Sequence, residues 1–162
     1  MRKKVSAMIL ILLLMCLVFI VSQYAASRNP HRMMVEPVFT EAGISVYQTG
    51  TSYLVLTEYR GKATGMLEFT DERTLVKHEE ILPPEITDIR ILLGKTLEDV
   101  ECEYGNYHVN TGSGFFIPSY ITMDGYLVKM WIEDGVVAHV SKIDLFSGTG
   151  TEWYALDSIA SQ

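Results

Sequence analysis

Histidines and acidic side chains are the residues that a catalytic or metal site in this chain would use. The four histidines are not spaced like the ligands of a metal site: His31, His78, His108 and His139. Only His78 has acidic neighbours, Glu79 and Glu80, and a carboxylate beside an imidazole is an acid–base pairing. We expect these three residues to form a solvated polar stretch. A hydrolase that uses His78 and the neighbouring acids is a weaker alternative.

Acidic side chains also cluster on one predicted helix, at Glu98, Asp99, Glu101 and Glu103. Calcium loops arrange their carboxylates around a turn that contains a glycine, and this spacing differs from that arrangement. The sequence therefore predicts a solvated helix face at these residues. It predicts no metal ion and no other cofactor.

The single cysteine after the hydrophobic N-terminal run, Cys102, lies between two glutamates instead of in the electropositive setting of a reactive thiolate. We expect it to be a small buried residue. Because Cys16 lies inside the hydrophobic run, no disulfide can form within the domain. The segment 110–114 lacks the Lys-Ser/Thr ending of a phosphate loop and the strand-to-helix turn of a nucleophile elbow, so we expect a mobile loop.

Aromatic side chains between residues 115 and 131 are the candidate functional surface. A sheet with one covered face can use its other face for a partner, and Tyr and Trp are favoured at the centre of interfaces. The candidate partner-binding residues are Phe115, Phe116, Tyr120 and Trp131. Ordinary core and cross-strand packing is the alternative explanation for the same residues.

The first 24 residues are predicted to act as a signal anchor or a signal peptide. Arg2, Lys3 and Lys4 precede an uncharged run over residues 5–21. As a helix, this run spans about 26 Å, close to the roughly 30 Å hydrocarbon core of a bilayer. Because basic residues stay on the cytoplasmic side, the remainder of the chain is expected outside the cytoplasm.

Three fates of this segment remain open. Retention as a single-pass anchor is favoured, because the apolar run is slightly long for a signal peptide. Cleavage at Ala25-Ala26-Ser27 is the alternative and would release a secreted protein. Lipidation of Cys16 is disfavoured, because Leu14 and Met15 are not the small residues that precede a lipidated cysteine.

The part of the chain after residue 24 is acidic. The whole chain has 13 Lys and Arg against 20 Asp and Glu, and three of the basic residues precede the hydrophobic run. This charge repels nucleic-acid phosphates and anionic lipid headgroups. The composition therefore excludes nucleic-acid binding and polybasic attachment of the domain to a membrane surface.

Residues 25–37 contain two prolines and no periodic pattern, and they are predicted to form a juxtamembrane linker. In the domain that follows, over residues 38–146, alternating and β-branched residues between 44 and 70 predict an antiparallel meander. Residues 71–80 fit either a short helix or a further strand. Residues 147–162 are predicted to form a tail that starts flexible and ends in a turn of helix carrying Trp153, Tyr154, Leu156 and Ile159.

A short amphipathic helix is predicted after Thr96. Thr96 is a favoured N-cap residue, and Asp99 occupies the position from which an acid completes a capping box. Gly105 ends the helix. Because a helix of only about nine residues is unstable in isolation, this helix must pack on a sheet.

That sheet is predicted from three runs, 115–123, 126–133 and 136–143, which Asp124-Gly125 and Asp134-Gly135 separate. Asp-Gly between alternating runs is a strong signal of a tight hairpin. In the middle strand, alternate residues share a face. The face that includes Val128 and Met130 is expected to cover the helix, with Trp131 on the opposite face, and Pro118 is expected to place the first strand at an edge or a bulge.

The predicted helix over residues 94–105, with the loop and the meander that follow it, resembles the repeat unit of the β-lactamase-inhibitor-protein fold over residues 89–146. The small outer-membrane assembly lipoproteins of the SmpA/OmlA group share this fold. Gly94, Thr96, Val100 and Gly105 match the Gly-x-Thr-x-x-x-Val-x-x-x-x-Gly pattern of these families. The resemblance covers about 60 residues, and this chain lacks the lipobox of those lipoproteins. It implies a non-enzymatic, protein-binding domain.

The sequence therefore predicts an α+β protein: an N-terminal transmembrane or signal helix, then a small antiparallel-sheet domain with one or two short helices packed on the sheet. We expect a non-catalytic, extracytoplasmic domain that residues 5–21 anchor to the cell membrane and that binds a protein partner in the cell envelope. The alternative is a secreted ligand-binding or inhibitor-type protein, released by cleavage.

Overall fold

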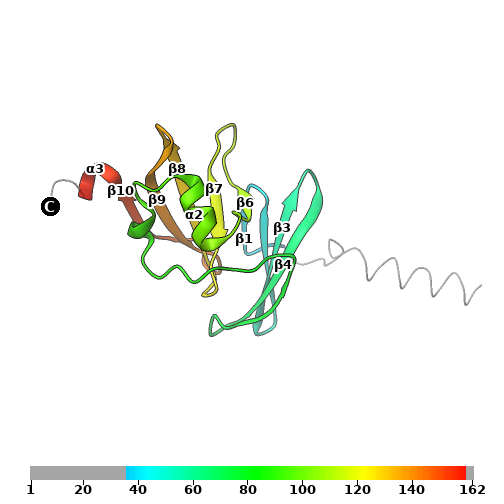
Figure 1. The fold of residues 1–162 in the computed structure, drawn as a ribbon. Coiled ribbons are helices and arrows are strands. Elements are labelled where there is room, and N and C mark those ends of the chain that lie inside the picture. Colours follow the sequence, from blue (N-terminus) through cyan, green and yellow to red (C-terminus); the bar gives the residue numbers. More distant parts are fainter. Residues whose placement is uncertain (1–35, 160–162) are drawn as a thin grey trace, which may run out of the picture. The chain divides into compact units, whose positions relative to one another are not determined.

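The described part of the chain, residues 36–159 of a computed structural model, consists mainly of strands in two antiparallel sheets (Figure 1). In sheet A, each strand pairs with the next one along the chain. Its strands are β1 (Phe39–Glu41), β2 (Ile44–Thr49), β3 (Ser52–Tyr59), β4 (Lys62–Thr70) and β5 (Leu75–Glu79). The predicted meander is confirmed, and the segment 71–80 contains a strand and not a helix.

Sheet B is a second meander, with the strand order β10-β9-β8-β7-β6. Its strands are β6 (Val109–Asn110), β7 (Pro118–Ile121), β8 (Tyr126–Glu133), β9 (Val136–Asp144) and β10 (Gly150–Ala155). The helices of the described residues are short: η2 (Ile89–Leu92), a 3-10 helix, α2 (Leu97–Tyr104) and α3 (Leu156–Ile159). The domain is therefore small, antiparallel and rich in sheet.

Sheet B has a hydrophobic core on each of its faces, because alternate residues of a strand point to opposite sides. Leu127 of β8 belongs to a buried cluster that includes Phe69 of sheet A. Its neighbours Val128 and Met130 belong to a second cluster that includes Val100 of α2. The prediction that Val128 and Met130 cover the helix is confirmed.

Helix α2 begins and ends where the sequence predicts. The Thr96 hydroxyl accepts a hydrogen bond from the Asp99 N–H at 3.1 Å, and the Asp99 carboxylate accepts one from the Thr96 N–H, which completes the capping box. Gly105, with φ of 81°, is the C-cap, and its N–H donates to the Glu101 carbonyl. The helix holds Val100 fully buried against sheet B.

The two Asp-Gly turns differ in length. Glu133 pairs with Val136, so Asp134 and Gly135 form a two-residue turn in which both have positive φ, as the sequence predicts. At the other turn, the Thr122 N–H donates to the Tyr126 carbonyl, so three residues separate the paired positions. Gly125 takes the left-handed conformation there, with φ of 76°.

Pro118 does not mark an edge strand. It is the first residue of β7, and the two-residue strand β6 pairs with β7 on the outer side. Strand β7 covers only Pro118–Ile121 of the predicted run 115–123. A proline is compatible with this position because the first residue of a strand need not donate a ladder hydrogen bond.

The domain extends beyond residue 146. Residues 150–155 form β10, the edge strand of sheet B, where the sequence predicted a flexible tail followed by a helical turn. Trp153 and Tyr154 therefore lie in a strand, and only Leu156 and Ile159 belong to helix α3.

The predicted signal anchor and most of the predicted linker precede residue 36 and lie outside the described residues. Within residues 36–159, no helix is long and apolar enough to cross a membrane.

Candidate functional site

Two tryptophans and a histidine form an aromatic cluster on sheet B. The rings of Trp131 on β8 and Trp153 on β10 have centroids 4.9 Å apart and lie at 64° to each other. His139 of β9 pairs with Trp131 across the sheet and stacks on Trp153, with centroids 5.5 Å apart. We call these three residues the tryptophan shelf. Trp153 is 56% exposed, which makes the shelf accessible from solvent.

Lys129 marks the place where sheet A meets this face of sheet B. Its ammonium donates to the Glu41 carboxylate of β1 at 2.7 Å and lies 5.6 Å from the centre of the Trp131 ring. Leu127, on the same face of β8, is fully buried, whereas Trp131 is only partly buried. Sheet A therefore covers one end of this face and leaves the end with the shelf accessible.

Phe115 and Phe116 lie in the loop between β6 and β7, and they are 78% and 47% exposed. The Asn110 side chain closes this loop by accepting hydrogen bonds from the Gly112 and Ile117 N–H groups, at 3.1 and 2.9 Å. A Cβ at Gly112 would lie 1.9 Å from the Phe115 carbonyl oxygen, so the loop conformation requires glycine there. The two phenylalanines are thus presented by a loop with defined hydrogen bonds.

Three of the four candidate aromatics gather at one end of sheet B. Ser119 pairs with Lys129, which places the start of β7 beside the end of β8 that carries Trp131. In Figure 1 the β6–β7 loop and the β8–β9 hairpin project from the same end of the sheet. Phe115, Phe116 and Trp131 therefore lie at the same end of sheet B, although the Phe116 ring packs on Tyr107, which contacts the helix-side core. Their role in binding stays a prediction.

Tyr120, the fourth candidate, is fully buried and cannot contact a partner directly. Its hydroxyl donates to the Gly105 carbonyl at 2.5 Å, and its ring lies edge-on to Tyr104 and His108. Burial raises the pKa of the Tyr120 hydroxyl well above its ordinary value. Tyr120 belongs to the core between sheet B and helix α2.

Trp153 and His139 are the members of the shelf that sequence reasoning did not select. Trp153 was expected in a terminal helical turn, although residues 151–155 follow a Ser-Gly-Thr-Gly segment and carry two adjacent aromatics, a combination typical of a strand after a turn. His139 was placed on its strand correctly, but its contact with Trp153 depends on β10 being the neighbouring strand.

The remaining histidines and acids of the described residues serve the fold or face solvent. His78 is exposed on the edge strand β5. The helix acids Glu98, Asp99 and Glu103 are also exposed, as expected for a solvated face. Cys102 is exposed on α2, so the expectation that it is buried is wrong. Its place beside the solvated acids of α2, away from Val100, explains the difference.

His108 connects three segments of the core. Its Nδ1 accepts a hydrogen bond from the Ile121 N–H at 3.0 Å, and its imidazole also hydrogen-bonds to the backbone of Leu82. Burial lowers the pKa of His108 to about 4. The neutral imidazole is therefore the form that the fold requires.

We expect the free energy of unfolding to fall by about 3 kcal/mol between about pH 6.5 and pH 4 because of His108 alone. In this range the unfolded chain binds a proton at His108 that the native state does not accept, so stability rises with pH. Urea unfolding across this range measures the slope.

The variant His108→Asn tests this expectation, because the Asn side-chain oxygen can accept from the Ile121 N–H without titrating. Its slope of stability against pH should be shallower than that of the natural chain. The matched control is His78→Asn, which removes a histidine from the exposed strand β5. Equal slopes for the natural chain and His108→Asn would contradict the assignment.

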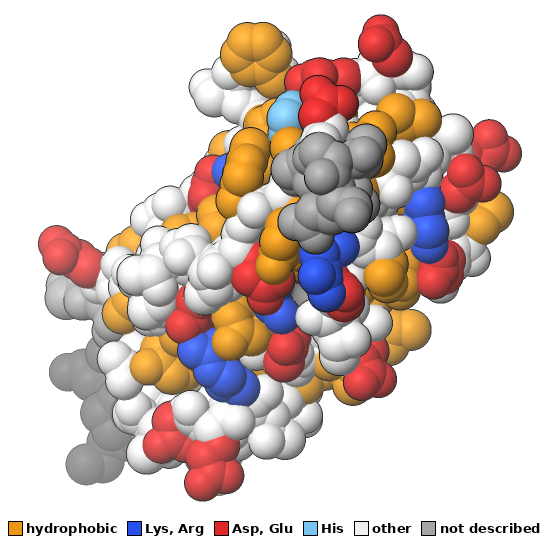
Figure 2. Space-filling view, turned by 90° about the vertical axis from the view of Figure 1, so that its left-hand side faces the viewer, with side chains coloured by type: hydrophobic (Ala, Val, Ile, Leu, Met, Phe, Trp, Pro, Cys, Tyr) orange, Lys and Arg blue, Asp and Glu red, His pale blue; other side chains and the backbone are white. Residues whose placement is uncertain are grey.

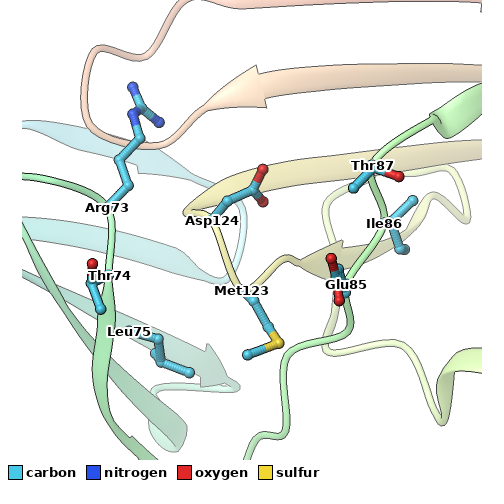
Figure 3. Close-up of a pocket in the computed structure, with 8 residues that line it drawn as sticks. All are labelled: Arg73, Thr74, Leu75, Glu85, Ile86, Thr87, Met123 and Asp124. Atoms are coloured by element: carbon cyan, nitrogen blue, oxygen red, sulfur yellow. The ribbon is translucent and has the colours of Figure 1, made fainter.

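A cavity of about 370 Å³ lies where the β4–β5 turn approaches residues 85–87 and the β7–β8 turn. Figure 3 shows that Arg73, at its rim, extends toward the β9–β10 loop and away from the space between Leu75 and Met123. The Arg73 guanidinium is bound to Asp144 at 2.5 Å. Arg73, the basic residue of this cavity, therefore stabilises the fold through its ion pair. The tryptophan shelf remains the stronger candidate site.

No group of three or more His, Cys, Asp or Glu within residues 36–159 is arranged to hold a metal ion. Comparison of the chain with family models, with curated proteins and with solved structures gave no match, so the resemblance to the inhibitor-protein fold stays a prediction.

Proposed function

We propose that this chain is a non-catalytic, membrane-anchored protein whose extracytoplasmic domain binds a protein partner in the cell envelope. Residues 5–21 provide the anchor, and the tryptophan shelf with the loop of Phe115 and Phe116 provides the binding surface. The proposal rests on the accessible pairing of Trp131 with Trp153. Tryptophan is enriched among the residues that dominate binding energy at interfaces.

The exposure of these aromatic side chains favours a role in binding a partner over a role in packing the core. Trp153 and Phe115 are 56% and 78% exposed, although both are large and apolar. Exposed hydrophobic side chains that lie together are typical of an interaction site, and Trp153 lies against Trp131 in the shelf. On the side that carries β10 and α3, hydrophobic side chains lie exposed among acidic ones (Figure 2).

Crosslinking of the full-length chain in producing cells, followed by recovery of the chain, tests this function. We expect Trp153→Ser and Trp131→Ser each to reduce recovery of the crosslinked partner about tenfold or more, because a central tryptophan contributes about 2 kcal/mol or more. The far-UV circular dichroism spectrum of Trp153→Ser should remain native, since Trp153 is largely exposed on an edge strand.

The matched control is Tyr59→Ser, which removes an aromatic side chain that is 64% exposed at the end of β3 in sheet A. Its partner recovery should equal that of the natural chain. Undiminished recovery in both tryptophan variants, or an equal loss in Tyr59→Ser, would exclude the shelf as the binding surface.

A further inference from the structure

Trp153 remains largely exposed although two side chains of the shelf contact its ring. His139 stacks on the ring at 5.5 Å and 21°, and Trp131 approaches it at 64°. Trp153 is nevertheless 56% exposed, so much of the indole remains accessible beside these two contacts. An indole face attracts a Lys ammonium or Arg guanidinium within about 6 Å of the ring centre.

Acidic side chains lie beside the shelf. A Glu133 carboxylate oxygen is 3.5 Å from Nε2 of His139. Next to His139 is a cavity of about 220 Å³, lined by the acidic residues Glu133, Asp134 and Asp157 and by the apolar residues Val136, Ala138 and Leu156. Small-molecule sites measure roughly 300–1,000 Å³, so this cavity suits a single side chain.

The domain's own cations are engaged elsewhere. Residues 36–159 contain eight Lys and Arg against 20 Asp and Glu, and six of these eight form ion pairs. Lys129, the cation nearest Trp131, is held by Glu41 and its side chain is only 11% exposed. In Figure 2 the Lys and Arg side chains lie beside acidic ones. The shelf is therefore complementary to a cation from outside the domain.

We propose that the tryptophan shelf binds Lys or Arg side chains of a basic segment of the partner protein. The hydrocarbon stem of the cationic side chain lies along the exposed Trp153 indole, and its charged group enters the cavity between Glu133 and Asp134. This inference rests on the proposed function, because it names the chemistry of the partner at the same site.

An acidic partner does not fit this surface, since the carboxylates beside the shelf would repel it. A purely apolar partner would remove the Glu133 and Asp134 carboxylates from water without supplying a cation to either, which costs free energy. A basic segment is not repelled by these carboxylates, and its cations pair with them when the interface excludes water. Its charge also accelerates the encounter, because the whole domain attracts cations.

Trp131 and Trp153 are the two tryptophans of the chain, so tryptophan fluorescence, excited apart from tyrosine, reports on the shelf. The full-length chain in zwitterionic detergent micelles is titrated with an alternating Lys-Val peptide and with a Glu-Val peptide of equal length. We expect saturable binding of the Lys-Val peptide, at least about tenfold tighter than that of the Glu-Val peptide. High salt should weaken the binding strongly.

Two double variants, each of which removes two negative charges, distinguish binding at the shelf from general attraction to the acidic domain. Glu133→Gln with Asp134→Asn should weaken the Lys-Val peptide about tenfold. Glu72→Gln with Glu98→Gln, at exposed positions away from the shelf, should leave the affinity within about twofold. Equal effects of the two double variants would overturn the proposal.

The outcomes distinguish this inference from the proposed function. If the Glu-Val peptide or an uncharged Ser-Val peptide binds as tightly as the Lys-Val peptide, the basic partner is excluded. The proposed function then still stands if Trp153→Ser abolishes crosslinking in cells. If the Trp153→Ser variant no longer binds the Lys-Val peptide but still crosslinks to the partner in cells, the shelf is a cation-binding surface but not the partner site.

Discussion

Tyr120→Ala is expected to destabilise the domain by about 3–5 kcal/mol, the range for truncating a large buried aromatic side chain. Tyr120 is fully buried in the core between sheet B and α2, and its ring contacts Tyr104 and His108. Because small domains are stable by only about 5–15 kcal/mol in total, this loss is enough to populate the unfolded state. Urea unfolding followed by tryptophan fluorescence measures the change.

Tyr120→Phe separates the hydroxyl from the ring. The hydroxyl donates to the Gly105 carbonyl at the end of α2, and Gly105 is exposed, so water can replace the lost donor. We therefore expect a cost of only about 1 kcal/mol. If Tyr120→Ala instead keeps native stability and loses the partner, Tyr120 acts at the interface and its assignment to the core is wrong.

The position of Tyr120 shows how far the sequence could predict the site. A two-residue turn at Asp124-Gly125 would pair Met123 with Tyr126 and place Tyr120 opposite Lys129, on the face with Trp131. The turn has one more residue, and Tyr120 pairs with Val128. A shift of one residue moves every side chain of a strand to the other face, so the composition of the turn could not fix the face.

Local sequence patterns were enough to predict those features whose contacts are made between residues close together in the sequence. The capping box of α2, the hairpin at Asp134-Gly135 and the two faces of β8 all follow from residues a few positions apart. The tryptophan shelf depends instead on β10 pairing with β9, and its rings come from three strands. No short-range signal relates Trp131 to Trp153, so the sequence selected only one of them.

Arg73→Met is expected to destabilise the domain by about 2 kcal/mol at pH 7. Arg73 follows β4 of sheet A and binds Asp144 at the end of β9, so its ion pair links the two sheets. Its guanidinium also lies 4.8 Å from the Tyr126 ring centre and 5.1 Å from that of Phe146. Breaking a fully buried pair costs about 3–5 kcal/mol, and we expect less here because 33% of the Arg73 side chain is exposed.

This loss should depend on pH in a defined direction. Burial alone would raise the pKa of the Asp144 carboxyl, but hydrogen bonds from Arg73 and from the Phe146 N–H hold it below its ordinary value. A carboxyl with a lowered pKa stabilises the native state above the pKa of the unfolded chain, and this stability is lost as the pH falls through the native pKa. The difference between the natural chain and Arg73→Met should therefore shrink below about pH 4.

The matched control is Lys77→Met, which breaks the ion pair with Glu79 on the edge strand β5. Both side chains of that pair are more than half exposed, and such pairs contribute about 0–1 kcal/mol. Combining Arg73→Met with Asp144→Asn should recover part of the loss, because the partner then carries no unpaired charge. Equal losses in Arg73→Met and Lys77→Met would mean that the Arg73–Asp144 pair adds nothing to the stability of the domain beyond a surface ion pair.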